Sequence, residues 1–421
     1  MKSLKIWLLF MAFWFLFCTP SCLLANDELV TNGKSVILMD AKSGRILYEN
    51  NSTERVPPAS LTKIMTGLLI CENGNLNKKV IISEYAAATP ESTAYLEAGE
   101  VLTRLELLYA AMLVSANDAC VALAESMVDS ETDFVEIMNR RANELGAYNT
   151  HFVNPHGLHD ENHYSTAYDL AILTRVALAN PVFAEVVSTQ RKIIPWDSRP
   201  DEDRILLNKN RLLYRYEDAV GVKTGYTRQA GNCVVGAAQR GDMLLIAVSL
   251  NSSTVYEDLE TLLEFGFDNY HMAQLGKTQD LLWDIMIEDG ESPTVRVRPV
   301  MDLQVAVTDE EVPYLSYSLS VKPKNSAPIR IGDILGTCKI YLEGEQVGQI
   351  EVIAQDEVLI KQMQAPALLR QPLLNLCVTL GILGVLILLF SKYPPLQNGL
   401  KRLILLLLRK RIPSQYRRPR Y

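Results

Sequence analysis

The sequence predicts a mixed α/β domain, a smaller all-β domain after it, and a transmembrane helix near the C-terminus. Three observations support this. Between Ser35 and Tyr270, runs with helical spacing alternate with short strand-like runs. Beyond residue 275, short alternating segments recur between Gly, Pro and Asp turns, as in all-β domains. Residues 372–390 are almost wholly apolar.

The first 25 residues have the order of a secretory signal peptide. Lys2 and Lys5 precede the uncharged run 6–17, and small residues follow it. We expect the mature chain to begin near Asn26. Leu23 is large for a position three residues before the cut, so an uncleaved anchor helix is the alternative. Either interpretation predicts an exported protein.

The first domain is expected over residues 26–272. Helical spacing occurs over 103–128 and 133–146. The expected strands are Ser35–Met39, Arg45–Tyr48, Gly221–Lys223, Cys233–Ala238 and Met243–Ser249.

The second domain is expected over residues 275–365, as a β pedestal between the first domain and the membrane. Its strand-like segments are Thr294–Arg298, Leu303–Val307, Ser316–Val321 and Lys339–Leu342.

Residues 372–391 are expected to cross a lipid bilayer as a helix. No charge lies between Arg370 and Lys392, and a helix of this length spans about 30 Å of hydrocarbon. A buried core helix is the alternative, but it would normally have a polar face. The tail 392–421 contains nine Lys or Arg and no acidic residue, which predicts a cytoplasmic location. Within it, Leu403–Leu408 is too short to span and is expected to lie along the inner leaflet.

Charge and cysteine content limit the partners and the chemistry. The net charge is −8 although the tail is basic, so the exported part is acidic and a nucleic-acid-binding role is excluded. Cys71, Cys120, Cys233 and Cys338 are widely scattered in a chain large enough to bury a core. We expect buried thiols, although an even count in an exported protein permits disulfides.

Ser60 is the candidate nucleophile. Two prolines, Pro57 and Pro58, precede it just before an apolar helical run, so Ser60 lies at a helix start with Lys63 one turn later on the same face. A lysine whose proton is loosened by burial or by a neighbouring cation can act as base for a serine hydroxyl. Alone, this spacing more often marks a helix-capping serine and a surface lysine.

Two further motifs change that balance. Ser115 and Asn117 follow the apolar run 107–114, and Lys223-Thr224-Gly225 ends a strand that turns through Tyr226. Ser115 can relay a proton to a leaving amine, and Asn117 can hold a substrate amide. Lys223 and Thr224 can bind a carboxylate.

Gly225 allows close approach of its strand, and the N–H groups of Ser60 and Tyr226 would form an oxyanion hole. Together, Ser-x-x-Lys, Ser-x-Asn and Lys-Thr-Gly are the set shared by β-lactamases and penicillin-binding proteins.

With these motifs the chain resembles the low-molecular-mass penicillin-binding proteins with D-alanyl-D-alanine carboxypeptidase activity, peptidase family S11. Four further segments match the family, and the likeness covers residues 29–270. They are Asp40–Gly44, Ser115–Ala119, Phe152–Leu158 and Ser165–Leu170.

The resemblance implies the DD-peptidase fold, with an antiparallel sheet flanked by helices, a small β domain and membrane attachment. It implies that Ser60 attacks the penultimate D-Ala carbonyl of a peptidoglycan stem peptide, releases D-Ala, and leaves an acyl-enzyme that water hydrolyses. β-Lactam antibiotics would acylate the same serine, with no metal or cofactor required.

The chain departs from the family pattern at two places. Relatives often have an Arg that helps hold the terminal carboxylate where this chain has Val255. Arg228 is a candidate replacement, or simply a solvated turn residue. Members often end in an amphipathic anchor, whereas a full span and a basic tail are expected here.

Two other functions are alternatives. A β-lactamase of related fold needs a second general base for deacylation, which a glutamate motif supplies in class A enzymes. The segment of this chain nearest to that motif, 204–208, begins with Arg204 instead of a glutamate, which counts against this alternative. A catalytically weak penicillin-binding scaffold is favoured by Val255 and the tail, but the intact motifs count against it.

Two metal- or phosphate-like patterns are interpreted as structural. His156, His159 and His163 lie in one loop beside Asp160, but their spacing suits a helix face and the loop contains Pro and Gly. Gly276-Lys277-Thr278 lacks the first glycine of a phosphate-binding loop.

Overall fold

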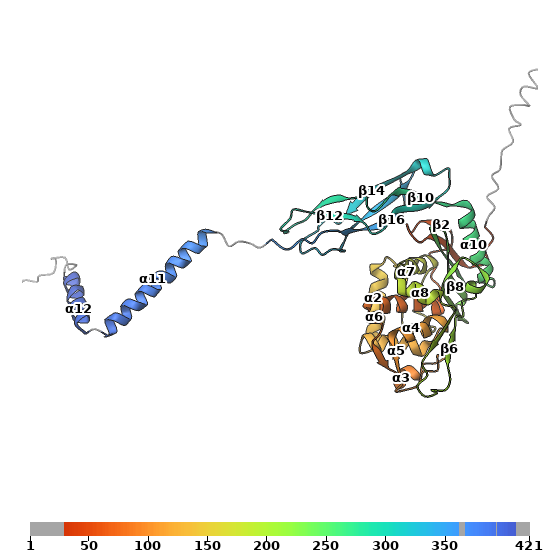
Figure 1. The fold of residues 1–421 in the computed structure, drawn as a ribbon, viewed down its shortest axis with the longest axis horizontal. Coiled ribbons are helices and arrows are strands. Elements are labelled where there is room, and N and C mark those ends of the chain that lie inside the picture. The colour runs from red at the N-terminus through yellow and green to blue at the C-terminus, as the bar shows by residue number, and fades with distance from the viewer. Residues whose placement is uncertain (1–28, 362–366, 393, 410–421) are drawn as a thin grey trace, which may run out of the picture. The chain divides into compact units, whose positions relative to one another are not determined.

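A computed structural model describes residues 29–361, 367–392 and 394–409 (Figure 1). The predicted signal peptide lies outside these residues. The chain divides into two compact units. The first holds residues up to Met286 with 295–325 and 330–357, and the second holds 287–294, 326–329 and the chain from 358 onward. Both predicted domains belong mainly to the first unit.

An antiparallel five-stranded sheet forms the centre of the first domain. Its order is β2 (Ile46–Asn50), β1 (Ser35–Asp40), β9 (Met243–Leu250), β8 (Gly231–Arg240) and β7 (Ala219–Thr227). Along β1, Val36 and Leu38 enter one hydrophobic core while Ile37 and Met39 enter another. Both faces are therefore buried, which explains why β1 and β9 are apolar with little alternation.

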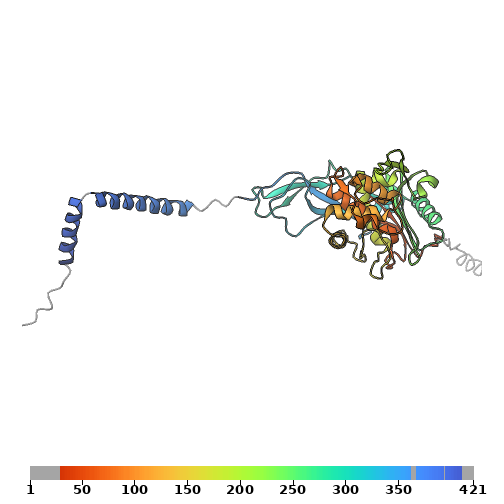
Figure 2. The same ribbon diagram turned by 90° about the horizontal axis from the view of Figure 1, so that it is seen from below.

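Helices cover both faces of this sheet. Figures 1 and 2 show α10 (Val255–Asn269) on the opposite side from α7 (Ala167–Ala179) and α8 (Pro181–Ser188), and the packing contacts agree. Other helices on the α7 side or at the edges of the sheet are η1 (Ala59–Thr62), α2 (Lys63–Asn73), α3 (Glu84–Ala87), α4 (Arg104–Leu113), α5 (Asn117–Met127) and α6 (Glu131–Glu144). The short helix α9 (Leu212–Arg215) contributes Leu212 to the core on the α10 side. Two small hairpin sheets pair β3 (Lys79–Ile81) with β4 (Val101–Thr103), and β5 (Arg191–Ile194) with β6 (Arg204–Leu207).

The helix predicted over 103–128 is two helices, so that prediction was wrong at its middle. Thr103 and Glu106 form a capping box that begins α4, as expected of a Thr three residues before a Glu. The helical pattern is interrupted at Ser115, which has a φ of 65°. Residues other than glycine rarely adopt this left-handed conformation, and a residue in it ends a helix because it cannot continue the hydrogen-bond pattern. The break presents Ser115 and Asn117 at the start of α5.

The second domain consists of strands, as predicted. Its main sheet has the order β11 (Trp283–Met286), β12 (Thr294–Pro299), β16 (Glu345–Ala354), β15 (Ile334–Leu342) and β14 (Leu315–Val321). A second sheet pairs β10 (His271–Gly276) with β13 (Leu303–Val307), and the short helix η2 (Val312–Tyr314) precedes β14. Lys277 and Thr278 follow β10, where the Thr278 N–H donates to Asp302 at 2.9 Å. This segment is a structural turn.

Helices α11 (Ala367–Lys392) and α12 (Pro394–Arg409) occupy the C-terminal part. Within the described ranges, no single helix is both long and apolar enough to cross a membrane; one bent pair, α7 with α8 at 106°, passes on length and composition. The predicted span 372–391 falls inside α11, where the described apolar segment is Asn375–Leu389, so a transmembrane helix is not shown.

The cysteines of the two domains are buried thiols, as expected. Cys71, Cys120, Cys233 and Cys338 are each free in the structure. Burial raises the pKa of the Cys120 thiol to about 11, so it is neutral at physiological pH.

Candidate active site

Ser60 lies in the turn η1 and Lys63 is the first residue of α2, so both are at one helix N-terminus. The Lys63 amine donates to Ser60 Oγ at 3.0 Å. The preceding residue, Ala59, has a φ of 49°, an unusual value for a residue with a Cβ. This sharp turn sets the serine ahead of the helix, and the two predicted residues are in contact.

Lys63 is completely buried. Its amine also donates to Asn117 Oδ1 at 2.8 Å and to the His156 carbonyl at 2.6 Å. Burial lowers the pKa of Lys63 to about 8, with a smaller contribution from the charge of Lys209. At pH 7 about one tenth of the molecules then hold a neutral amine, against fewer than about one in a thousand for an unperturbed lysine. Lys63 can therefore accept the Ser60 proton.

A second lysine–serine pair involves Lys223 and Ser115. Lys223 is 1% exposed, and its amine donates to Ser115 Oγ and to the Thr224 carbonyl, both at 3.1 Å. Burial first, and then the charge of Lys63, lower the pKa of Lys223 well below its ordinary value. An anionic substrate group beside Lys223 would favour its protonated form.

Asn117 is held in one orientation. Its Oδ1 accepts from Lys63, its Nδ2 donates to the Pro90 carbonyl at 2.8 Å, and its backbone N–H donates to the Ser92 carbonyl at 2.7 Å. One amide hydrogen and one oxygen lone pair remain available for a substrate amide.

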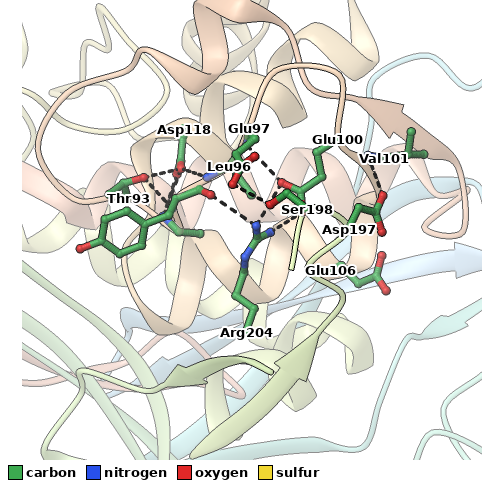
Figure 3. A network of polar contacts seen from close by, with 12 residues as sticks. Thr93, Leu96, Glu97, Glu100, Val101, Glu106, Asp118, Asp197, Ser198 and Arg204 are labelled. Atoms are coloured by element: carbon green, nitrogen blue, oxygen red, sulfur yellow. Dashed lines mark hydrogen bonds and ion pairs between the residues drawn. The ribbon is translucent and has the colours of Figure 1, made fainter. Parts of the chain in front are cut away.

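The loop that supplies those carbonyls is fixed by Asp118, as Figure 3 shows. Its buried carboxylate accepts from the Thr93 hydroxyl and from the N–H groups of Ala94 and Leu96, both at 3.1 Å. Asp118 directly follows Asn117 at the start of α5, so this helix start anchors the same loop that orients Asn117.

Arg204 holds the same loop from the β5–β6 hairpin (Figure 3). Its guanidinium forms a buried ion pair with Glu100, with N–O distances of 2.7 and 3.1 Å, and donates to the Tyr95 carbonyl at 3.3 Å. The segment that begins with Arg204 therefore has a structural task.

Two glycines allow the elements of the site to come together. A Cβ at Gly225 would lie 3.0 Å from Ser60 N and 3.1 Å from the Pro58 carbonyl oxygen, so β7 approaches the nucleophile as the sequence predicted. A Cβ at Gly157, where φ is 89°, would lie 1.9 Å from the Ala59 carbonyl oxygen. Only glycine fits there, and this close packing places the His156 carbonyl within hydrogen-bond distance of the Lys63 amine.

Comparison with known proteins identifies the family. Residues 24–254 match the model of the S11 peptidases, described as D-alanyl-D-alanine carboxypeptidase. The chain belongs to this family. Residues 268–359 match the C-terminal domain of penicillin-binding protein 5.

Curated S11 relatives cover most of the chain. The D-alanyl-D-alanine carboxypeptidase DacF of Bacillus subtilis is 35% identical over 342 residues, which are 79% of this chain and 87% of that protein. The D-alanyl-D-alanine carboxypeptidase DacC of Escherichia coli is 30% identical over 368 residues, 82% and 90% of the two chains. The predicted family is confirmed.

Solved S11 structures agree with the fold. Penicillin-binding protein 5 of Haemophilus influenzae has a TM-score of 0.61 at 26% identity, covering 78% of this chain and 98% of that one. The carboxypeptidase DacD of Francisella tularensis has a TM-score of 0.58 at 28% identity, covering 79% and 95%. The DD-peptidase fold with a C-terminal β domain is therefore confirmed.

The structure brings most predicted site residues of this S11 protein together. Ser60, Lys63 and Asn117 are joined by hydrogen bonds, and Ser115 and Lys223 form a second pair. Thr224, Gly225 and Tyr226 follow on β7, which continues to Thr227, so the turn comes later than predicted. Thr224 is half-buried and Tyr226 is 63% exposed.

The three-histidine loop contributes structure and a backbone acceptor. Thr62 Oγ1 lies 2.8 Å from His163 Nε2, and the Val153 N–H donates to His163 Nδ1 at 3.2 Å. Burial lowers the pKa values of His156 to about 3 and His163 to about 4, so both rings are neutral near pH 7. In the parts of the chain that the structure describes, no cluster of His, Cys, Asp or Glu suits a metal ion.

The sequence did not mark two contributors. The first is the His156 carbonyl, because a backbone acceptor cannot be recognised from a side-chain motif. The Pro-His-Gly turn that contains it was the available sign of a fixed backbone at this position. Lys209 follows β6, donates its N–H to the Leu113 carbonyl at 2.9 Å, and lowers the pKa values of Lys63 and Lys223 through its charge. Val255 is buried at the start of α10, and Arg228 is exposed in the β7–β8 turn.

Proposed function

We propose that Ser60 is the nucleophile of a serine-type D-Ala-D-Ala carboxypeptidase and Lys63 its base. The chain acts on peptidoglycan stem peptides that end in D-Ala-D-Ala, as expected for its family, and takes part in cell-wall remodelling. The observation that supports the assignment is the 3.0 Å contact between Ser60 Oγ and a buried Lys63 whose pKa is lowered to about 8. Such an amine is basic enough to take the hydroxyl proton and partly free at neutral pH.

Acylation proceeds by proton transfer and addition. Lys63 takes the Ser60 proton while Oγ bonds to the penultimate D-Ala carbonyl carbon, and the N–H groups of Ser60 and Tyr226 stabilise the oxyanion. The C–N bond then breaks, and Ser115 passes a proton to the leaving D-Ala amine. Its own proton is replaced from Lys223 at 3.1 Å.

Deacylation reverses the order with water. Once D-Ala has left, Lys63 releases to solvent the proton that it took from Ser60, and Lys223 regains a proton from solvent. Lys63 then takes a proton from water, the hydroxide adds to the ester carbonyl, and the C–O bond to Ser60 breaks as Lys63 returns the proton to Oγ. Before acylation, Lys223 and Thr224 hold the terminal carboxylate of the substrate, and Asn117 meets the substrate amide with its remaining hydrogen. A β-lactam opens by the same attack and stays on Ser60.

The decisive experiment compares D-Ala release from Nα,Nε-diacetyl-Lys-D-Ala-D-Ala by the full chain and its Ser60→Ala variant. We expect release by the wild type and a loss of at least about a thousandfold in the variant. Intact mass after benzylpenicillin should show one adduct on the wild type and none on the variant. An adduct without D-Ala release would instead support the weak scaffold.

We also propose that the chain is exported and attached to the membrane by its C-terminal part, with the tail in the cytoplasm. The uncharged run between Arg370 and Lys392 and the basic residues after it support this topology. Membrane fractions washed with high salt should retain the full chain and release a chain that ends at residue 361. Release of both would contradict the proposal.

A further inference from the structure

A cavity of about 380 Å³ adjoins the site just described. Two of its lining residues also hold the reacting groups. The His156 carbonyl accepts from Lys63, and the Pro90 carbonyl accepts from Asn117. The remaining lining comes mainly from α3 and the loop after it, from the start of α6, and from the loop 154–158, with Tyr85, Thr89, Glu131, Asn154 and Leu158 among its residues.

The charge in this cavity comes from Glu131. Tyr85 Oη donates to Glu131 Oε2 at 2.9 Å, and His156 Nε2 lies 3.9 Å from Glu131 Oε1. The His156 ring is neutral near pH 7 because burial lowers its pKa to about 3. The lining contains no Lys or Arg. A carboxylate beside a hydroxyl, in a lining that has no cationic side chain, can pair with an ammonium group.

We propose that this cavity binds the side-chain ammonium of the diamino acid that precedes D-Ala-D-Ala in the stem peptide, with Glu131 as its counter-ion. The inference rests on the proposed function. That residue belongs to the acyl portion, which stays on Ser60 after D-Ala leaves, and it is one residue, or about 3.5 Å, from the attacked D-Ala.

The consequence is a preference for uncrosslinked stems. In a crosslinked stem the same amine is acylated, so it carries no charge and is bulkier. Glu131 then discriminates free stems from crosslinked ones by charge and by space.

The test uses the full chain and a matched pair of peptides. D-Ala release is measured from Nα-acetyl-Lys-D-Ala-D-Ala, which has a free ε-amine, and from its Nα,Nε-diacetyl counterpart. The enzymes are wild type, Glu131→Gln and Glu136→Gln. Gln at 131 keeps an acceptor for Tyr85 but removes the charge. Glu136 lies exposed on the same helix, so its variant reports any general effect of removing a carboxylate.

We expect the wild type and Glu136→Gln to favour the free-amine peptide by about tenfold in kcat/KM, and Glu131→Gln to bring the ratio to about one. A ratio that is unchanged in Glu131→Gln would overturn the inference. So would a loss of equal size for both peptides and for benzylpenicillin acylation, which would make Glu131 a positioning residue for His156. No release from either peptide by the wild type would overturn the proposed function itself.

Discussion

At the scale of single residues, the site depends on two buried amines. Lys63 and Lys223 are each within 3.1 Å of a serine hydroxyl, and burial lowers the pKa of each. Desolvation is what converts an ordinary ammonium into a base that works near neutral pH.

The pH dependence of acylation follows from Lys63. Its pKa is lowered to about 8, so the reactive free amine increases as pH rises. We expect the benzylpenicillin acylation rate to rise about tenfold per pH unit below pH 8 and to level off above it. Stopped-flow acylation from pH 5.5 to 9 measures this, and His156 and His163 titrate below that window.

Lys209→Met provides a check on the assignment. The Lys209 charge lowers the Lys63 pKa, so its removal should move the midpoint of the profile to higher pH. A profile that is flat from pH 6 to 9 in the wild type would exclude Lys63 as the titrating base.

Gly225→Ala tests the close approach of β7. The new Cβ would lie 3.0 Å from Ser60 N, so the strand or η1 must shift. We expect acylation to slow by about a hundredfold, because small displacements of reacting groups are costly, and stability to fall by about 1–3 kcal/mol.

Gly241→Ala is the matched control. Its φ of 63° makes an Ala strained, but a Cβ there meets nothing within 4 Å. Urea unfolding should show a loss of about 1 kcal/mol with normal acylation. Equal acylation rates in the two variants would show that the Gly225 contact is unimportant.

At the scale of elements, the break between α4 and α5 organises the site. It gives three neighbouring residues different partners. Ser115 contacts Lys223, Asn117 contacts Lys63, and Asp118 anchors the loop 93–96. In a continuous helix, successive side chains would point about 100° apart around the axis. The break is therefore what gives these three side chains their observed directions.

Asp118→Ala should loosen that loop. It leaves the buried N–H groups of Ala94 and Leu96 without their acceptor, which we expect to cost about 3 kcal/mol of stability. Because Pro90 and Ser92 then hold Asn117 less firmly, kcat/KM for D-Ala release should fall by about tenfold or more.

Asp118→Asn keeps one carbonyl oxygen and should lie between wild type and Ala in both measurements. A stability loss without any loss of kcat/KM would separate the loop from catalysis.

At the scale of the whole molecule, polar contacts join the two domains of the first unit. Arg45, in the turn before β2, forms two bonds of 2.6 and 2.8 Å with Glu311 and donates to the Ala306 carbonyl at 2.7 Å. Lys42 donates to Gln304 at 2.7 Å, and Arg175 to the Gln349 carbonyl at 3.0 Å.

Arg45→Ala should weaken this junction. Arg45 is 8% exposed while the Glu311 side chain is 25% exposed, so partial solvation limits the loss to about 1–3 kcal/mol. Urea unfolding followed by fluorescence should show an earlier transition that separates into two steps.

Arg296→Ala, which removes an exposed pair with Asp356, should leave the unfolding midpoint in place. A single unshifted transition in Arg45→Ala would mean that the domains are coupled elsewhere.

The sequence by itself determined the family, the order of the three motifs, the two domains and the Ser60–Lys63 pair. These depend on local spacing and on the joint occurrence of the three motifs, since residues three apart at a helix start lie on the same face. The tertiary structure decided where the long helical pattern breaks at Ser115, that the His156 carbonyl and Gly157 pack against η1, and that Glu131 faces a cavity beside them. Those features depend on contacts between residues tens of positions apart, and no local period encodes such contacts.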